Sequence, residues 1–203
     1  MKSKKIIIFT IFVIVLIFVT IFLILHYKNG KGGNTMINKS EGEIVEYILN
    51  IKSYEAKLNI TVETNKNKTE YVVSQKLQNN LAQQEVIQPT NIAGVITEYD
   101  GSNLKIKNNK LDLETTFQNY QYIVKNKLWL DSFIEDYKMK ENPTTVSSND
   151  NEIILEVKTN ENTYNVYKKL YVDKKTAKPI KMIVQDINKK ILVYILYTEI
   201  TIS

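Results

Sequence analysis

Alternation of apolar and polar side chains is the feature that most limits how this chain can fold. From Tyr54 onward, apolar residues occupy every second position and polar residues lie between them. The apolar set of this first segment is Ala56, Leu58, Ile60 and Val62. Because successive side chains of a β-strand point to opposite faces, the pattern predicts a strand with one buried and one solvated face.

Similar segments follow, separated by turn residues, and together they predict about nine or ten antiparallel strands. The clearest hairpin signal is Asp100-Gly101 between two β-prone segments. The C-terminal segment "LYVDKKTAKPIKMIVQDINKKILVYILYTEI", Leu170 to Ile200, predicts a meander of three strands. The other predicted strands lie at 54–63, 69–78, 79–88, 110–117, 151–159 and 163–173.

Two segments repeat with the period of a helix instead. Ser40 and Glu43 have the spacing of a capping box, and apolar residues follow at helical spacing. Within residues 119–140, a second apolar set falls on one helix face, and Pro143 follows it. The first set is Ile44, Val45, Ile48 and Leu49, and the second is Leu130, Phe133, Ile134 and Tyr137.

A sheet of this size needs a partner for its buried face, and the two predicted helices are the partners that the sequence offers. We therefore expect an α+β fold that is mainly β. In it, a curved antiparallel sheet carries the helices packed in its concave face. This arrangement predicts a cavity between sheet and helices that is lined by apolar side chains.

The segment Ile6–Leu25 contains no charged residue. As a helix it spans about 30 Å, the thickness of a membrane's hydrocarbon core, which predicts a transmembrane anchor. A cleaved signal peptide is the alternative, but its apolar part is shorter and small residues follow it. We therefore expect a cytoplasmic tip and anchor at 1–28, a flexible tether at 29–40 and an extracytoplasmic domain at 41–203.

Lysines flank this predicted anchor. Three lysines precede it, Lys2, Lys4 and Lys5, and two follow it, Lys28 and Lys31. With the terminal amine, the positive charge is greater on the N-terminal side, which predicts a cytoplasmic N-terminus and an external domain. All 22 acidic residues lie beyond residue 33, where they balance the remaining lysines. The formal charge of +5 therefore belongs to the anchor region. A nucleic-acid-binding domain would itself be basic, so we expect no nucleic-acid partner.

Composition also limits the chemistry. The chain has no cysteine, which excludes disulfides, thiolate metal sites, a cysteine nucleophile and lipid attachment to cysteine. Its only histidine, His26, lies at the predicted membrane interface. We expect no catalytic residue, no cofactor and no metal ligand. The absence of arginine and the many lysine, asparagine and isoleucine residues are typical of a low-GC bacterium.

Three acidic residues, Asp131, Glu135 and Asp136, cluster on the second predicted helix. Paired carboxylates or a weak calcium site are conceivable there. The outer face of an amphipathic helix is also usually charged, and we adopt this interpretation of a solvated face.

Aromatic residues are the candidate contacts of the cavity or of a partner protein. The aromatic side chains of the second predicted helix can fasten that helix to the sheet or line the cavity. Those of the last strand belong to "ILVYILY" (191–197), which is apolar on both faces. Such a strand fits either the centre of a sheet or a surface that docks another protein. The full set is Trp129, Phe133, Tyr137, Tyr194 and Tyr197.

The order of these elements resembles the LolA-like domain family from Glu43 to Ile202. "ILNIKSYEAKLNITVET" is similar to the opening helix and first strand of that family, and "VITEYDGSNLKIKN" to its hairpin. The C-terminal meander, with "VD..T..P.K", resembles its closing strands. Within the family, the chain looks most like the clostridial germination lipoprotein GerS and its homologues. Those proteins carry a lipidated cysteine, which this chain lacks.

The resemblance implies an unclosed antiparallel half-barrel with helices over its hollow side. It also implies a membrane-attached, non-enzymatic protein that binds a cell-envelope partner, such as a cortex amidase, in spore cortex maturation or germination. Carrier-type relatives imply an alternative, in which the cavity binds a lipid or the acyl chain of a lipoprotein. A third hypothesis is a structural or regulatory subunit that senses envelope stress.

Overall fold

A computed structural model of the chain describes residues 39–120, 128–159 and 166–203. These residues belong to the compact unit Met36–Ser203. Within the described ranges, no helix is long and apolar enough to cross a membrane. The predicted anchor Ile6–Leu25, His26 and most of the predicted tether lie outside these ranges, so the anchor and its orientation remain predictions.

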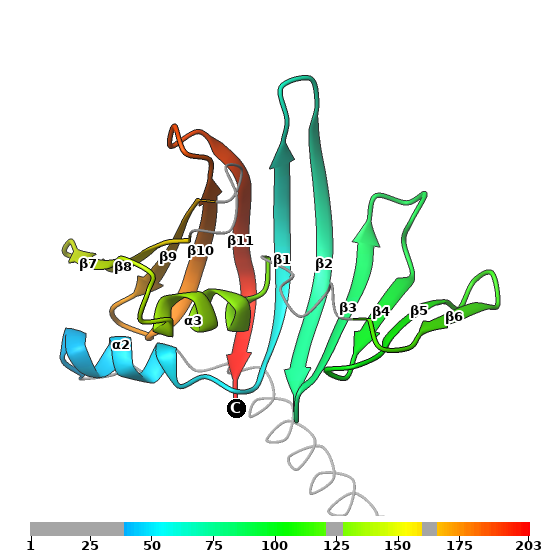
Figure 1. The fold of residues 1–203 in the computed structure, drawn as a ribbon, viewed down its shortest axis with the longest axis horizontal. Helices are drawn as coiled ribbons and strands as arrows, with labels where there is room; N and C mark the ends of the chain where they lie inside the picture. Colours follow the sequence, from blue (N-terminus) through cyan, green and yellow to red (C-terminus); the bar gives the residue numbers. More distant parts are fainter. Residues whose placement is uncertain (1–38, 121–127, 160–165) are drawn as a thin grey trace, which may run out of the picture. The chain divides into compact units, whose positions relative to one another are not determined.

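One antiparallel sheet contains eleven strands in the order β6-β5-β4-β3-β2-β1-β11-β10-β9-β8-β7 (Figure 1). Each strand pairs with its neighbour in sequence, except that β1 pairs with β11 and no pairing links β6 to β7. The strands are β1 (Tyr54–Glu63), β2 (Lys68–Gln78), β3 (Leu81–Gln88), β4 (Val95–Tyr99), β5 (Leu104–Asn108), β6 (Leu113–Phe117), β7 (Thr144–Ser148), β8 (Glu152–Lys158), β9 (Tyr167–Asp173), β10 (Lys178–Gln185) and β11 (Ile191–Ile202).

The two helices are α2 (Glu41–Leu49) and α3 (Leu130–Lys138). Both arms of the predicted capping box form, since the Ser40 side chain accepts from the Glu43 N–H and the Glu43 carboxylate accepts from the Ser40 N–H. The helix α3 ends before Pro143, and Met139 already has extended backbone angles. Two helices and an unclosed antiparallel sheet confirm the mainly β architecture.

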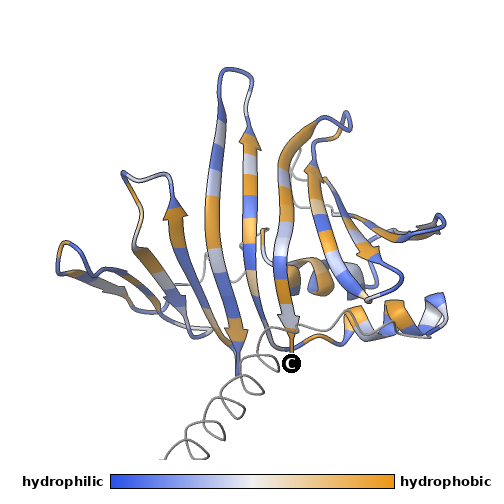
Figure 2. Cartoon of the chain, turned by 180° about the vertical axis from the view of Figure 1, so that it is seen from behind, coloured by the Kyte–Doolittle hydropathy of each residue, from blue (hydrophilic) through white to orange (hydrophobic). Residues whose placement is uncertain are grey.

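The buried residues identify the face of the sheet on which the helices lie, which we call the inner face. Ile44 and Ile48 of α2 and Phe133 of α3 pack in one core cluster with alternate residues of β1, β2 and β8–β11. The hydropathy bands of the strands in Figure 2 follow this alternation. The core residues of the sheet include Leu58, Val73, Leu155, Leu170, Met182 and Ile195. The opposite side is the outer face.

Two strands of the sheet, β7 and β11, bear on the sequence-based expectations. The strand β7 was not predicted, because all five of its residues are exposed and its sequence "TTVSS" has no apolar alternation. The apolar strand β11 lies between β1 and β10 and is therefore a central strand and not an edge. Its outward residues Tyr194 and Leu196 are only partly buried, so docking of a protein on this face stays a prediction.

Candidate functional site

A groove of about 660 Å³ opens on the inner face between α3 and strands β2–β5. The end of α2 and the residues after it border one side, and the turn at Gly101 borders another. Its volume falls within the usual range of ligand sites in proteins, about 300–1,000 Å³. Apolar lining residues include Leu77, Leu104, Trp129 and Ile134, and polar ones include Asn50, Lys52, Gln84, Thr97, Tyr99, Asp131, Glu135 and Lys138.

This mixed lining arises because the inner face has two chemically different halves. On β8–β11 the inward residues are almost all apolar. On β2–β4, the residues Gln75, Gln84 and Thr97 lie opposite one another and form a polar row across the sheet. The sequence predicts apolar side chains around the cavity, whereas the groove combines apolar residues with amide, hydroxyl and charged groups.

A chain of hydrogen bonds links α3 to this polar row. The Leu130 N–H donates to the Tyr54 hydroxyl over 3.4 Å, and that hydroxyl donates to the side-chain Oε1 of Gln75 over 3.3 Å. The Gln75 amide then donates to Gln84 over 2.9 Å. The Tyr54 ring also packs against Trp129, with ring centroids 6.3 Å apart. Burial raises the pKa of Tyr54, so this phenol stays protonated and can donate.

A buried ion pair fastens the other side of α3 to the sheet. The Lys168 ammonium on β9 lies 2.5 Å from an Asp136 carboxylate oxygen and donates to the Ser132 hydroxyl over 3.1 Å. The Lys168 side chain is fully buried and that of Asp136 is 6% exposed. The solvated-face interpretation of the acidic cluster is therefore wrong for Asp136, because this side of α3 faces the sheet.

Asp131, in the first turn of α3, also departs from the solvated-face interpretation. It is half-buried in the groove wall, and burial raises the pKa of its carboxyl group. Its Oδ1 atom has no hydrogen-bond partner among the described residues. Glu135, the third acidic residue of this cluster, is exposed at the rim of the groove.

The structure places four of the five aromatic candidates on the inner side and one on the outer face. Trp129 lines the groove. Phe133 packs in the core, and its ring centroid is 5.8 Å from that of Tyr137. Tyr197 is buried on the inner face of β11 and pairs with Leu58 of β1. Tyr194 is three positions earlier on the same strand, next to the core residue Ile195, and its side chain faces outward.

Several residues of this site were missed by sequence reasoning. Lys168 alternates with Leu170 and Val172 in β9, so the strand period alone places a lysine among inward-facing residues. Gln75 occupies an inward position of β2 in the same way. Strand periodicity could therefore have singled out both residues, although not their partners.

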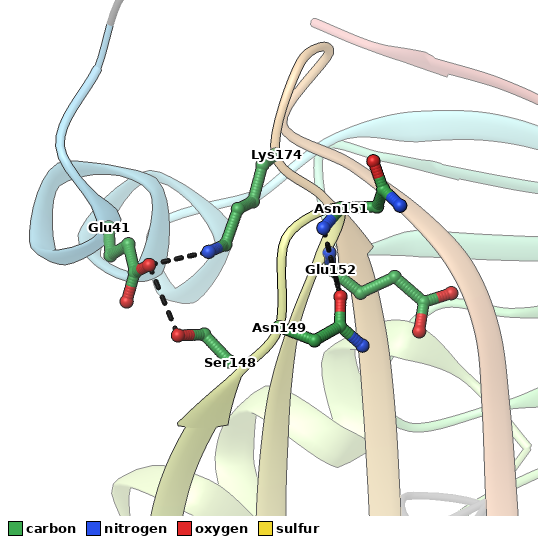
Figure 3. Close-up of polar contacts among 6 residues, drawn as sticks. All are labelled: Glu41, Ser148, Asn149, Asn151, Glu152 and Lys174. Atoms are coloured by element: carbon green, nitrogen blue, oxygen red, sulfur yellow. Dashed lines mark hydrogen bonds and ion pairs between the residues drawn. The ribbon is translucent and has the colours of Figure 1, made fainter.

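Polar contacts at the start of α2 attach that helix to the β9–β10 turn and to the end of β7 (Figure 3). The Glu41 carboxylate accepts from Lys174 over 2.6 Å and from the Ser148 hydroxyl over 3.1 Å. Beside them, the Asn149 side chain accepts from the N–H groups of Asn151 and Glu152 and orders the β7–β8 turn. The hydrogen bonds from Lys174 and Ser148 lower the pKa of Glu41.

The described residues offer no evident metal site. Across 39–120, 128–159 and 166–203, no three histidine, cysteine, aspartate or glutamate side chains are close enough to hold a metal ion. The groove offers hydrogen-bonding groups on an apolar floor, which suits binding of a ligand or of a partner segment.

A family model described as sporulation protein YdcC-like matches residues 3–202. The chain belongs to this YdcC-like sporulation family. No curated protein matches the chain significantly.

Several solved structures are similar to this chain. The chain is 25% identical to a chain in the complex of the CwlD amidase with the GerS lipoprotein from Clostridioides difficile. The match has a TM-score of 0.51 and covers 80% of this chain and 96% of that one. A conserved protein from Thermus thermophilus shares 12% identity at a TM-score of 0.51, covering 81% and 88%, and supports the fold. A LolA superfamily protein from Nitrosomonas europaea is 12% identical at a TM-score of 0.41, covering 81% and 94%. The GerS-like character expected from the sequence is confirmed.

Proposed function

We propose that this YdcC-like chain is a membrane-anchored, non-enzymatic protein of the cell envelope that binds a partner protein in spore cortex maturation or germination. The proposed partner is a cell-wall amidase of the CwlD type. The observation that carries the proposal is the likeness, over 80% of this chain, to one chain of the CwlD–GerS complex, together with membership of a sporulation family.

The proposed mechanism combines localisation with docking. The predicted anchor Ile6–Leu25 holds the domain on the outer side of the cytoplasmic membrane, and the tether at 29–40 limits its reach to a few tens of ångströms. Confinement to this layer raises the effective concentration of the domain for any partner at the same surface. An anchored helix would thus replace the lipid by which lipoproteins are held.

A binding role accounts for the residues better than catalysis does. There is no cysteine, so a cysteine–histidine pair is excluded, and a serine–histidine pair would have to use His26, the only histidine. The polar clusters beside α3 instead hold the helix on the sheet, as Lys168 and Asp136 do.

Binding to the CwlD-type amidase of the same organism tests this proposal. The full chain in lipid nanodiscs should retain the amidase in pull-down experiments and bind it in calorimetry. A chain lacking residues 1–28 should still bind in solution but should fail to restore spores in a deletion strain. Absence of amidase binding, together with normal sporulation and germination in the deletion strain, would contradict the proposal.

A lipid ligand is the second candidate, and the apolar floor of the groove favours it. Leu77, Leu104 and Ile134 contribute to that floor. Native mass spectrometry of the chain purified without nanodiscs would show a co-purifying lipid if the groove binds one. The polar row and the charged rim of the groove are arguments against an acyl chain, because polar groups buried against hydrocarbon lose their hydrogen bonds.

A further inference from the structure

A patch of apolar and aromatic side chains lies on the outer face of β8–β11. Across these strands, Tyr171 lies opposite Ile154 on one side and Lys181 on the other. Leu196 follows opposite Lys181, and two positions further along β10, Ile183 lies opposite Tyr194. We call the apolar and aromatic members of this surface the outer patch: Ile154, Tyr171, Ile183, Tyr194 and Leu196.

The outer patch differs from the outer surface beside it. On β1 and β2, every outward side chain except Val72 is polar or charged, and three lysines balance three glutamates. Such polar outward positions are usual in an antiparallel sheet with one solvated face. Both described helices pack on the inner face, so neither covers the outer patch. A contiguous apolar surface that is rimmed by polar groups marks an interaction site.

The outer patch is ordered by its own contacts. Ile183, beside Tyr194, is only 8% exposed, although its side chain points away from the inner core. The side chains of the other four members remain partly exposed. Tyrosines that are fixed by such packing lose little conformational entropy when they bind, and tyrosine is enriched among the residues that dominate binding energy.

Two lysines at the edge of the outer patch share one acidic partner. Lys169 on β9 and Lys189 in the β10–β11 turn each lie 2.7 Å from a carboxylate oxygen of Glu156. The Lys189 ammonium also lies 3.3 Å from the centroid of the Tyr167 ring, and its side chain is 46% exposed. One carboxylate cannot neutralise two ammonium groups, so this edge keeps a positive charge.

Two further lysines add to this charge. Lys181 lies 3.8 Å from a Glu152 carboxylate oxygen. Lys158 has no carboxylate partner among the described residues, and its ammonium lies 6.0 Å from the centroid of the Tyr167 ring. Four lysines around the outer patch therefore face two glutamates. This excess of positive charge favours a partner that carries acidic groups.

Three kinds of occupant can be compared with this surface. A second copy of the chain, related by twofold symmetry, would place identical patches and their excess lysines opposite each other, which is unfavourable. An anionic membrane would attract the lysines, but membrane binding also needs apolar side chains that insert, and each member of the outer patch is at least partly buried. A folded protein with apolar side chains flanked by carboxylates matches both the packing and the charge.

We propose that the outer patch is the surface on which this chain docks its partner protein, and that the partner contributes apolar side chains flanked by aspartate or glutamate. Tyr171 and Tyr194 form the apolar centre of this contact, and Lys158 and Lys189 attract and orient the acidic groups. The inference rests on the proposed function, because it assigns the docking surface for the proposed amidase. The groove on the inner face takes no part in this contact.

Photo-crosslinking identifies the occupant directly. The photo-reactive amino acid p-benzoylphenylalanine would replace Tyr194 in the full chain, which is held in lipid nanodiscs with the purified CwlD-type amidase. We expect irradiation to produce a covalent adduct of the chain with the amidase. The same amino acid in place of Ile96, which faces outward on β4 and lies outside the outer patch, is the control and should produce no such adduct.

Substitutions test the apolar centre and the charged edge separately. Tyr194→Ala should weaken amidase binding about tenfold or more in calorimetry. The double variant Lys158→Glu/Lys189→Glu should also bind more weakly at about 50 mM NaCl, and this loss should shrink at about 500 mM because salt screens exposed charges. Both lysines are exposed, so the double variant tests the docking surface even if Tyr194→Ala lowers the stability of the sheet.

A matched control for the charge reversal lies at the other end of the sheet. Lys105 on β5 forms a surface ion pair with Glu114 over 2.6 Å, and its side chain is 35% exposed. Lys105→Glu makes the same change of charge outside the outer patch. This variant should therefore bind the amidase with the affinity of the wild type.

Other outcomes would overturn the inference. An adduct from position 194 with a second copy of the chain or with lipid, in place of the amidase, would identify a different occupant. Equal amidase affinity for the wild type, Tyr194→Ala and the double lysine variant would show that docking uses another surface, while the proposed function would stand. Absence of amidase binding to the wild type would reject the proposed function and the inference with it.

Discussion

At the scale of single residues, the buried pair of Lys168 and Asp136 is the most consequential polar contact of the domain. Two charges in an apolar interior are costly unless they are paired and hydrogen-bonded, and here the Ser132 hydroxyl adds a further contact. Such a pair specifies where α3 lies on the sheet more than it adds net stability.

Removing one partner of this pair should be far more damaging than removing both. We expect Asp136→Leu to lower the free energy of unfolding by about 3 kcal/mol or more, because Lys168 would lose its carboxylate in a buried site. The double variant Asp136→Leu/Lys168→Met should recover most of this loss. Urea denaturation followed by circular dichroism measures all three proteins.

An exposed ion pair provides the control for this experiment. The side chains of Lys76 and Glu55 are 45% and 60% exposed. Replacing Glu55 with Gln should change the free energy of unfolding by about 0.5 kcal/mol or less. Equal effects of Asp136→Leu and Glu55→Gln would show that the buried pair is not the constraint described above.

The carboxyl group of Asp131 predicts a dependence of stability on pH. Its pKa is raised in the folded state by burial, so the folded state takes up a proton at a higher pH than the unfolded chain. Ionised Asp131 therefore costs stability at neutral pH, and this cost disappears as the pH falls through the raised pKa. Asp131→Asn should stabilise the protein at pH 7, and the difference from wild type should shrink in acid. A difference that is constant between pH 7 and pH 3 would contradict the assignment.

At the scale of elements, α2 depends on its capping box and on its contact with the sheet. Ser40→Ala removes the side-chain acceptor of the Glu43 N–H and should lower stability by about 1 kcal/mol. Gly42→Ala, two positions later, should raise stability by up to about 1 kcal/mol, because a β-carbon there meets no atom within 4 Å. Thermal unfolding of the two variants should shift in opposite directions. Shifts of the same sign would contradict one of these two assignments, and no shift in either variant would show that α2 unfolds separately from the sheet.

The helix α3 is held differently, by contacts along its length and not by a side-chain cap. Trp129 is its N-cap residue and makes no side-chain capping bond. The helix instead buries Leu130, Phe133 and Ile134 against the sheet and pairs Asp136 with Lys168. The position of α3 therefore depends on tertiary contacts, and so does the wall of the groove that α3 forms.

At the scale of the whole sheet, the position of a strand decides how much a substitution costs. Ile195 lies in the central strand β11 and is fully buried, whereas Leu113 lies in the edge strand β6 and is 61% exposed. Ile195→Ala should lower the free energy of unfolding by about 3–4 kcal/mol, and Leu113→Ala by well under 1 kcal/mol. Chemical denaturation of both variants checks this difference. A comparable loss for Leu113→Ala would place part of the core at the β6 edge.

The local pattern of the sequence was sufficient to predict the two helices and most of the strands. Alternation from Tyr54 and the capping box at Ser40 both correspond to observed elements, because strand and helix periods are properties of neighbouring residues. The strand β7 escaped prediction because neither of its faces is buried, so burial left no pattern in its sequence.

The arrangement in space was decided only by the tertiary structure. The sequence places Lys168 among inward-facing residues, but the partner Asp136 comes from a helix 32 positions earlier. In the same way, Tyr99 of β4 and Asp131 of α3 both line one groove. The strand β11, the last in the sequence, becomes central because it pairs with β1, the first. Periodicity fixes the face on which a side chain lies, whereas its partners depend on which distant segments pack together. The sequence predicts a cavity between sheet and helices, but the polar residues that line the groove are such partners and could not be predicted from the sequence.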